Sequence, residues 1–158
     1  MSRTYRHCLD YKKGLIPTDT DIFRVIDGEG DGRPGVFADQ MGDRVLVSTR
    51  DCPIPADLER ELRELDIPVF HKRLEQNQKE APVQIAGPEL PLQFTVTEQG
   101  VRFKIDMSTG YSQGIFLDQR DHRRQVRERS APGMRVLNTF AYTGAFSVYA
   151  ALGGAQTT

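Results

Sequence analysis

The stretch that most constrains the fold runs from Val136 to Thr158 and reads VLNTFAYTGAFSVYAALGGAQTT. Val136 and Leu137 end a short apolar run typical of a buried strand. A glycine-containing turn follows, and small and apolar residues then predict a helix. The last residues predict the start of another strand. This order of strand, turn, helix and strand predicts an α/β fold that begins as nucleotide-binding half-folds do.

The turn of this stretch is a candidate ligand site. Asn138 follows the predicted strand at its carboxyl end, where ligands of open α/β sheets bind. Gly144 would let the backbone approach a ligand closely, and the next helix would present free N–H groups to a carboxylate or phosphate. This turn lacks the GxGxxG dinucleotide fingerprint, and the chain contains no GxxxxGK[ST] motif, which argues against a phosphate cradle for a nucleoside triphosphate. A plain strand–helix core unit is the alternative.

A second candidate segment, GYSQGIFLDQRDHRRQVR, runs from Gly110 to Arg127 and mixes acidic and basic residues. One interpretation is a cofactor-facing loop from Ile115 to Arg120. A helix would follow, capped or opened by Asp118 and reaching about Arg129, with arginines that could hold phosphates. The alternative is a solvated helix held by ion pairs four residues apart.

The rest of the chain predicts a small α/β unit followed by a hairpin. A proline-rich loop is expected over residues 78–93, because several prolines interrupt regular structure. Residues 92–107 alternate around a turn at Gln99–Gly100, as in a β-hairpin. Residues 2–14 predict a short basic helix ended by Gly14, which is either a solvated amphipathic helix or an RNA-facing one. The expected strands cover residues 22–26, 36–38, 44–49 and 67–73, and a helix with an apolar face covers residues 56–65.

Composition limits the possible partners of the chain. The 158 residues carry a net charge of −1, so any RNA contact would be a local patch and not a general basic surface. No apolar run is long enough to cross a membrane, and the N-terminus lacks a signal-peptide core, which predicts a cytoplasmic protein. Cys8 and Cys52 lie far apart and are expected to be reduced thiols.

The segment DGEGDGRPG, from Asp27 to Gly35, has acidic residues at the spacing of a calcium-binding loop, but the last ligand of such a loop is missing. An EF-hand requires a bidentate glutamate at the twelfth position, and Ala38 occupies that position here. The segment is therefore interpreted as a tight turn, and no metal site is expected.

Three segments in this order resemble one known family: TDIFRVIDGEGDGRPGVFADQMGD, GIFLDQRDHRR and VLNTFAYTGAFSVYAALGGA. They are similar to the class I S-adenosylmethionine-dependent methyltransferases that act on 23S ribosomal RNA, most closely to the RlmI-like 5-methylcytosine enzymes. The resemblance covers the chain from about Asp19 to its end. It implies S-adenosylmethionine as the cofactor and 23S ribosomal RNA as the partner.

The resemblance also implies a domain order and a set of site residues. It implies a basic N-terminal helix or linker at 1–15, a central α+β domain at 16–105, and the beginning of a Rossmann-like methyltransferase domain at 106–158. The residues that match the cofactor motifs of the family are Phe116, Asp118, Arg120, Asn138, Phe140, Tyr142, Thr143 and Gly144.

The chain departs from the family pattern in several places. No PUA domain precedes the basic segment, and Ser112–Gln113 stands where the family often has Lys-Thr. Two functional groups of the family would lie beyond Thr158: the acidic residue that binds the ribose hydroxyls, and the nucleophilic cysteine. The chain is therefore expected to be an incomplete, inactive methyltransferase. It could pair with a second copy of itself. Cys52 lies in the central region and is expected to be inert.

Two other functions stay open at this point. The chain could be a non-catalytic RNA-binding or assembly module, or a nucleotide-binding module of another chemistry. Within the methyltransferase interpretation, the target base could also differ from cytosine.

Overall fold

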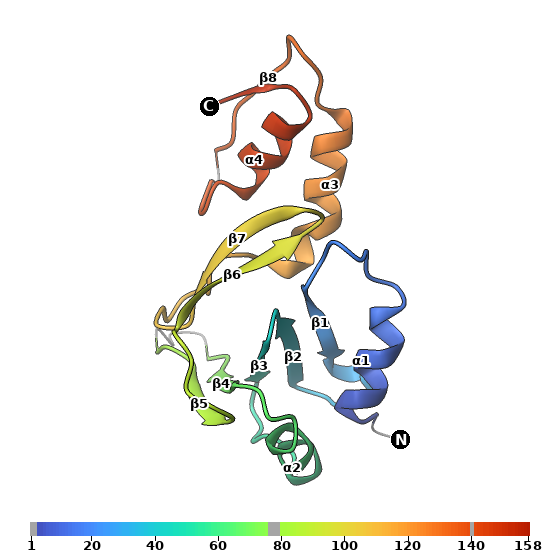
Figure 1. Ribbon diagram of the computed structural model, residues 1–158, viewed down its shortest axis with the longest axis vertical. Helices are drawn as coiled ribbons and strands as arrows, with labels where there is room; N and C mark the ends of the chain where they lie inside the picture. Colours follow the sequence, from blue (N-terminus) through green and yellow to red (C-terminus); the bar gives the residue numbers. More distant parts are fainter. Residues whose placement is uncertain (1–2, 76–79, 140) are drawn as a thin grey trace. The chain divides into compact units, whose positions relative to one another are not determined.

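The structure is a computed structural model that describes residues 3–75, 80–139 and 141–158 (Figure 1). The chain is of the mixed α/β type and divides into two compact units, which are called unit one (Met1–Gln113) and unit two (Gly114–Thr158).

Unit one is built on a mixed five-stranded sheet with the order β1-β2-β3-β4-β5. Its first three strands form an antiparallel meander. β3 and β4 are parallel and are joined through the helix α2 (Ala56–Arg63), so they form a β-α-β unit, while β5 is antiparallel to β4. The strands are β1 (Ile22–Asp27), β2 (Val36–Met41), β3 (Arg44–Thr49), β4 (Val69–Arg73) and β5 (Val83–Ala86).

The sheet and two helices of unit one share an apolar cluster of buried residues. Leu58 and Leu62 lie one turn apart on α2, and both are fully buried, as the apolar spacing of residues 56–65 predicts. The helix α1 (Tyr5–Lys13) adds Tyr5 and Cys8 to the same cluster. Burial of this continuous surface is the main source of stability of the unit.

The N-terminal helix is tied to the rest of unit one at both ends. The carboxylate of Glu61 accepts a hydrogen bond from the backbone N–H of Tyr5 at 2.8 Å, which satisfies a donor that the helix itself leaves free. Lys12 Nζ donates to Asp31 Oδ2 at 2.8 Å. The prediction of a short helix ended by Gly14 is confirmed.

The predicted hairpin is also confirmed, as β6 (Gln93–Glu98) and β7 (Val101–Asp106). Gln99 and Gly100 connect the strands with φ angles of +50° and +75°, the signs that a two-residue type I′ turn requires. The backbone N–H of Asp21, next to β1, donates to the carbonyl of Thr97 at 2.9 Å and ties the hairpin to the sheet.

The prediction of a loop throughout residues 78–93 is wrong in part, because Val83–Ala86 forms β5. Pro82 and Pro88 flank this strand and do not interrupt it. β5 also lies at the edge of the sheet, where proline is tolerated because one row of backbone groups needs no partner strand.

The acidic segment after β1 forms a short 3-10 helix, η1 (Gly28–Asp31), and Gly32 follows it with a φ of +69°. Among the described residues, no group of three or more histidine, cysteine or acidic side chains could hold a metal ion. Within the same described part of the chain, every helix is too short or too polar to span a membrane.

Unit two contains two packed helices and a two-stranded parallel sheet. Gly153 makes the close approach of the helices possible, because a Cβ at this position would lie 2.3 Å from the carbonyl oxygen of Arg127. The elements of unit two are η2 (Leu117–Gln119), α3 (Arg120–Arg129), β8 (Arg135–Val136), α4 (Ala145–Leu152) and β9 (Gln156–Thr157).

Candidate functional site

The candidate site of unit two begins where β8 ends. Val136 pairs with Thr157 of β9, and the backbone N–H of Asn138 donates to the carbonyl of Thr158 at 2.9 Å. The side chain of Asn138 donates through Nδ2 to Ser147 Oγ on α4 at 3.0 Å. Asn138 therefore fixes the end of the strand to the helix that follows.

The turn between β8 and α4 has an unusual backbone. Tyr142 adopts a φ of +47°, a left-handed conformation that is uncommon for a residue with a side chain, and Gly144 adopts a φ of +77°. The N–H of Gly144 donates to the carbonyl of Ala141, which closes the turn. Two left-handed residues so close together turn the chain sharply into α4.

The N-terminus of α4 is open to a ligand. Gly144 is the N-cap residue and supplies no side chain to the free N–H groups of the first turn, which also contains no acidic residue. A Cβ placed on Gly144 would meet no atom within 4 Å, so the space beside the backbone is free. A carboxylate or phosphate is favoured at such a helix end by the free donors and by the helix dipole.

A second segment lies against this turn, although it is distant in the sequence. Thr143 Oγ1 donates to the carbonyl of Gly114 at 2.9 Å, and the rings of Phe116 and Tyr142 pack with centroids 5.1 Å apart. Arg123 Nη1 donates to the carbonyl of Phe116 at 2.9 Å. The structure thus brings together Phe116, Tyr142 and Thr143, three of the residues singled out in the sequence.

The other residues singled out lie nearby or outside the described part. Asp118 is exposed in η2, where its carboxylate accepts a hydrogen bond from Gln119 Nε2 at 3.0 Å. Arg120 is half-buried at the first position of α3. Phe140 lies outside the described residues. Of the two roles predicted for Asp118, capping the charged helix is wrong, because the N-cap residue is Gln119 and makes no side-chain cap. Asp118 lies instead in η2, the turn that opens directly into α3.

Arg123 has a different role from the one that the charge pattern suggests. It is only 1% exposed, so it does not present its guanidinium to phosphates at the surface. The solvated-helix interpretation holds for Arg124, which pairs with Glu128 at 3.0 Å. Because α3 has few apolar residues, hydrophobic periodicity could not distinguish its inward position from its outward ones.

Both cysteines are free thiols, and neither lies in unit two. Cys8 is buried in the core of unit one, and burial raises the pKa of its thiol. Cys52 is half-buried, with Sγ 3.6 Å from the carbonyl oxygen of Gly35.

Comparison with known proteins identifies a family for most of the chain. Residues 58–158 match the family described as S-adenosylmethionine-dependent methyltransferase. The ribosomal RNA large subunit methyltransferase of Deinococcus radiodurans is 38% identical over 150 residues, a match that covers 87% of this chain and 36% of that protein. The ribosomal RNA large subunit methyltransferase I of Klebsiella pneumoniae is 32% identical, over 98% of this chain and 40% of that protein.

Solved structures give the same result. A structure described as a candidate methyltransferase complexed with S-adenosylhomocysteine is 32% identical and matches with a TM-score of 0.80, over 97% of this chain and 41% of that one. A candidate S-adenosylmethionine-dependent methyltransferase from Streptococcus mutans is 30% identical with a TM-score of 0.78, and the match covers 45% of its chain.

The chain thus spans about two fifths of the length of these relatives. The family match covers well over half of its own residues, and the fold agrees with that match. The chain belongs to the S-adenosylmethionine-dependent methyltransferase family and is related to ribosomal RNA large subunit methyltransferase I.

Proposed function

We propose that the chain takes part in transferring a methyl group from S-adenosylmethionine to a base of large-subunit ribosomal RNA, with C5 of a cytosine as the target. The observation that carries the proposal is the convergence of two segments at the turn before α4, through Thr143 with Gly114 and Phe116 with Tyr142. The relatives that carry ribosomal RNA methyltransferase names support the substrate class.

The residues of this turn fit the methionine end of the cofactor. The free N–H groups after Gly144 would bind the carboxylate, since neither a capping side chain nor an acid competes for them. Asn138 would hold the strand end, and the Phe116–Tyr142 pair would shield one side from water. When bound, the cofactor supplies an electrophilic methyl group on a sulfonium.

The role of the chain in this chemistry is to bind and orient the cofactor. Its Gly144 turn would fix the carboxylate, and the Phe116 loop would limit the positions that the rest of the molecule can take. Asp118 and Arg120 are assigned to the same site as polar contacts, because they follow the Phe116 loop directly. Orientation of this kind lowers the entropic cost of a transfer step.

A thermal-shift panel tests the choice of cofactor. We expect S-adenosylhomocysteine to raise the unfolding temperature of the 158-residue chain, because a ligand that binds only the folded state stabilises it. NAD and ATP should have no such effect. Stabilisation by ATP or NAD alone would contradict the proposal and would favour a nucleotide-binding module of another chemistry.

A further inference from the structure

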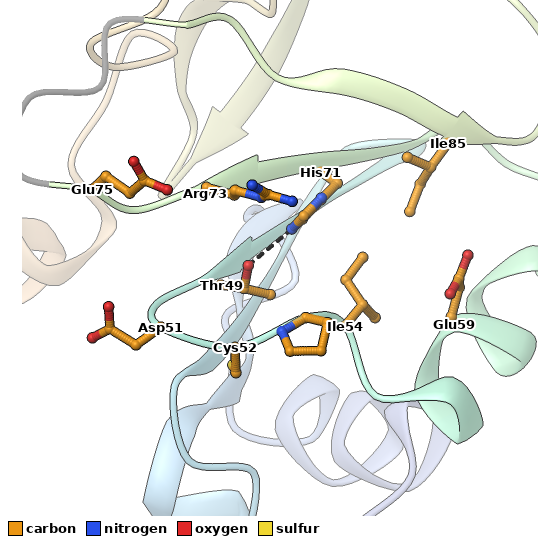
Figure 2. Close-up of a pocket in the computed structure, with 10 residues that line it drawn as sticks. Thr49, Asp51, Cys52, Ile54, Glu59, His71, Arg73, Glu75 and Ile85 are labelled. Atoms are coloured by element: carbon orange, nitrogen blue, oxygen red, sulfur yellow. Dashed lines mark hydrogen bonds between the residues drawn. The ribbon is translucent and has the colours of Figure 1, made fainter.

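A cavity of about 570 Å³ lies in unit one, at the carboxyl ends of β3 and β4 (Figure 2). These strands are parallel and joined through α2, and ligands of α/β sheets bind beyond the carboxyl ends of such strands. The volume falls within the range of roughly 300–1,000 Å³ that is usual for small-molecule sites. No candidate cofactor residue lines the cavity, because those residues all belong to unit two.

The cavity has apolar walls on two sides. Ile54, in the loop before α2, and Ile85, on β5, reach into it from opposite sides (Figure 2). Pro53 extends the apolar surface beside Ile54. Apolar groups on opposite sides of a cavity suit a flat ring, whose two faces lose contact with water when it enters.

One polar group at the cavity has a fixed orientation and a free hydrogen-bonding position. His71 Nε2 lies 2.9 Å from Thr49 Oγ1, and this hydrogen bond orients the imidazole (Figure 2). Burial lowers the pKa of His71, and the positive charge of Arg73 lowers it further, so the ring is neutral at pH 7. Among the described residues, Nδ1 of His71 has no partner, so it can bond to a ligand.

Two charged side chains supply complementary contacts. Glu59 Oε1 accepts a hydrogen bond from Arg63 at 2.6 Å, and its other oxygen has no partner among the described residues. A free carboxylate oxygen accepts hydrogen bonds from the exocyclic amino groups of cytosine, adenine and guanine. Arg73 makes no ion pair within the described part of the chain, and a guanidinium suits a phosphate.

We propose that this cavity binds one unpaired nucleotide with an amino-bearing base. The base lies between Ile54 and Ile85, its amino group donates to Glu59, and its phosphate contacts Arg73. Asp51 and Glu75 also line the cavity, and their negative charges oppose a bare anion, so inorganic phosphate should not bind. The proposal rests on the proposed function only in that an RNA strand would supply the nucleotide.

The test is an NMR titration of the isotope-labelled 158-residue chain with cytidine and uridine monophosphates. We expect saturable shifts at the amides of Thr49, Cys52 and Arg73, with cytidine monophosphate binding about tenfold more tightly. Uridine presents a carbonyl oxygen where cytidine has its amino group, and this oxygen is repelled by Glu59. Equal affinities, no saturable shifts, or shifts caused by inorganic phosphate alone would overturn the proposal.

Matched variants distinguish the effect of cavity charges on nucleotide affinity from the effect of the overall charge of the chain. Glu59→Gln should remove the preference for cytidine monophosphate, and Arg73→Met should weaken both nucleotides about tenfold. The controls Glu64→Gln and Arg60→Met change exposed charges on or beside α2 that do not line the cavity. A loss of affinity in the controls as large as in the cavity variants would contradict the proposal.

A titration with an oligonucleotide identifies the source of the nucleotide. A short oligocytidylate that binds more tightly than the monophosphate would assign an RNA strand, and an oligocytidylate that fails to bind would assign a free nucleotide. Because none of these titrations uses the methyl-donor cofactor, failure here is distinct from failure of the proposed function.

Discussion

Single residues with left-handed backbone fix the sharpest turns of this chain. Gly87 is the most constrained of them, with a φ of +79° and a position where a Cβ would lie 2.0 Å from the carbonyl oxygen of Ile67. Gly133 has a similar φ of +89°, but a Cβ there would meet nothing within 4 Å. A comparison of alanine substitutions at these two glycines therefore separates the free-energy cost of a steric clash from that of the backbone angle alone.

Gly87→Ala should therefore destabilise the chain more than Gly133→Ala. The clash and the backbone strain together should cost about 3 kcal/mol at Gly87, against about 1 kcal/mol for the strain at Gly133. Urea unfolding of both variants beside the unchanged chain gives the two values. Equal losses would show that the backbone of Ile67 moves freely to accommodate the new methyl group.

Asp31 makes a pH-dependent contribution to stability. Burial raises the pKa of its carboxyl, but hydrogen bonds from Lys12 and the backbone of Asp27, with the charge of Arg3, outweigh burial and hold the pKa below its usual value. The carboxylate is therefore favoured in the folded state. Its contribution is complete above the unfolded-state pKa of about 3.9 and is lost as the pH falls through the lower folded-state pKa.

Asp31→Asn should accordingly lower stability at neutral pH and flatten the loss of stability in acid. Urea midpoints measured across the acid range would show the effect. Asp10→Asn, a change at an exposed position of α1, is the control and should keep the slope of the unchanged chain. An unaltered acid slope in Asp31→Asn would contradict the assignment.

At the scale of elements, α3 holds the loop that carries Phe116. Arg123→Met keeps a long side chain but removes the donor to the Phe116 carbonyl, so we expect a loss of about 1–3 kcal/mol and faster hydrogen exchange in the loop from Gly114 to Leu117. Arg124→Met breaks only exposed ion pairs, with Asp121 and Glu128, each worth about 0.5 kcal/mol. Similar effects of the two changes would refute a special role for Arg123.

Most helices and strands could be predicted from the sequence because their patterns were strong. Leu58 and Leu62 marked the buried face of α2, and Gln99–Gly100 marked the hairpin turn. β5 was missed because four residues between prolines give little periodic signal, and its pairing with β4 is a tertiary contact. The inward position of Arg123 was missed because α3 has few apolar residues on any face.

The candidate site could be predicted as two separate motifs, but not as one arrangement. The sequence placed Asn138 and Gly144 around a strand–helix turn and Phe116 in a different loop. The contact of Thr143 with Gly114 joins positions far apart along the chain, and only the folded structure shows it. The assignment of these residues, with Asp118 and Arg120, to cofactor binding stays a prediction.

At the scale of the molecule, the two units differ in how much regular structure each contains. Unit one has a five-stranded sheet packed on an apolar cluster, whereas the sheet of unit two consists of two strands of two residues each. Short paired strands protect their amides poorly. We therefore expect slower hydrogen exchange in β2 and β3 than in β8 and β9, and equal protection would contradict this account.

The measurement that tests the central claim most directly is an NMR titration of the 158-residue chain with S-adenosylhomocysteine. The account predicts saturable shifts at the amides of Gly144, Ala145 and Phe116. Gly144→Val should remove them, while Gly133→Val, which places the same side chain at another open left-handed glycine, should leave them intact. Shifts that survive in Gly144→Val, or that map only to unit one, would contradict a cofactor site at this turn.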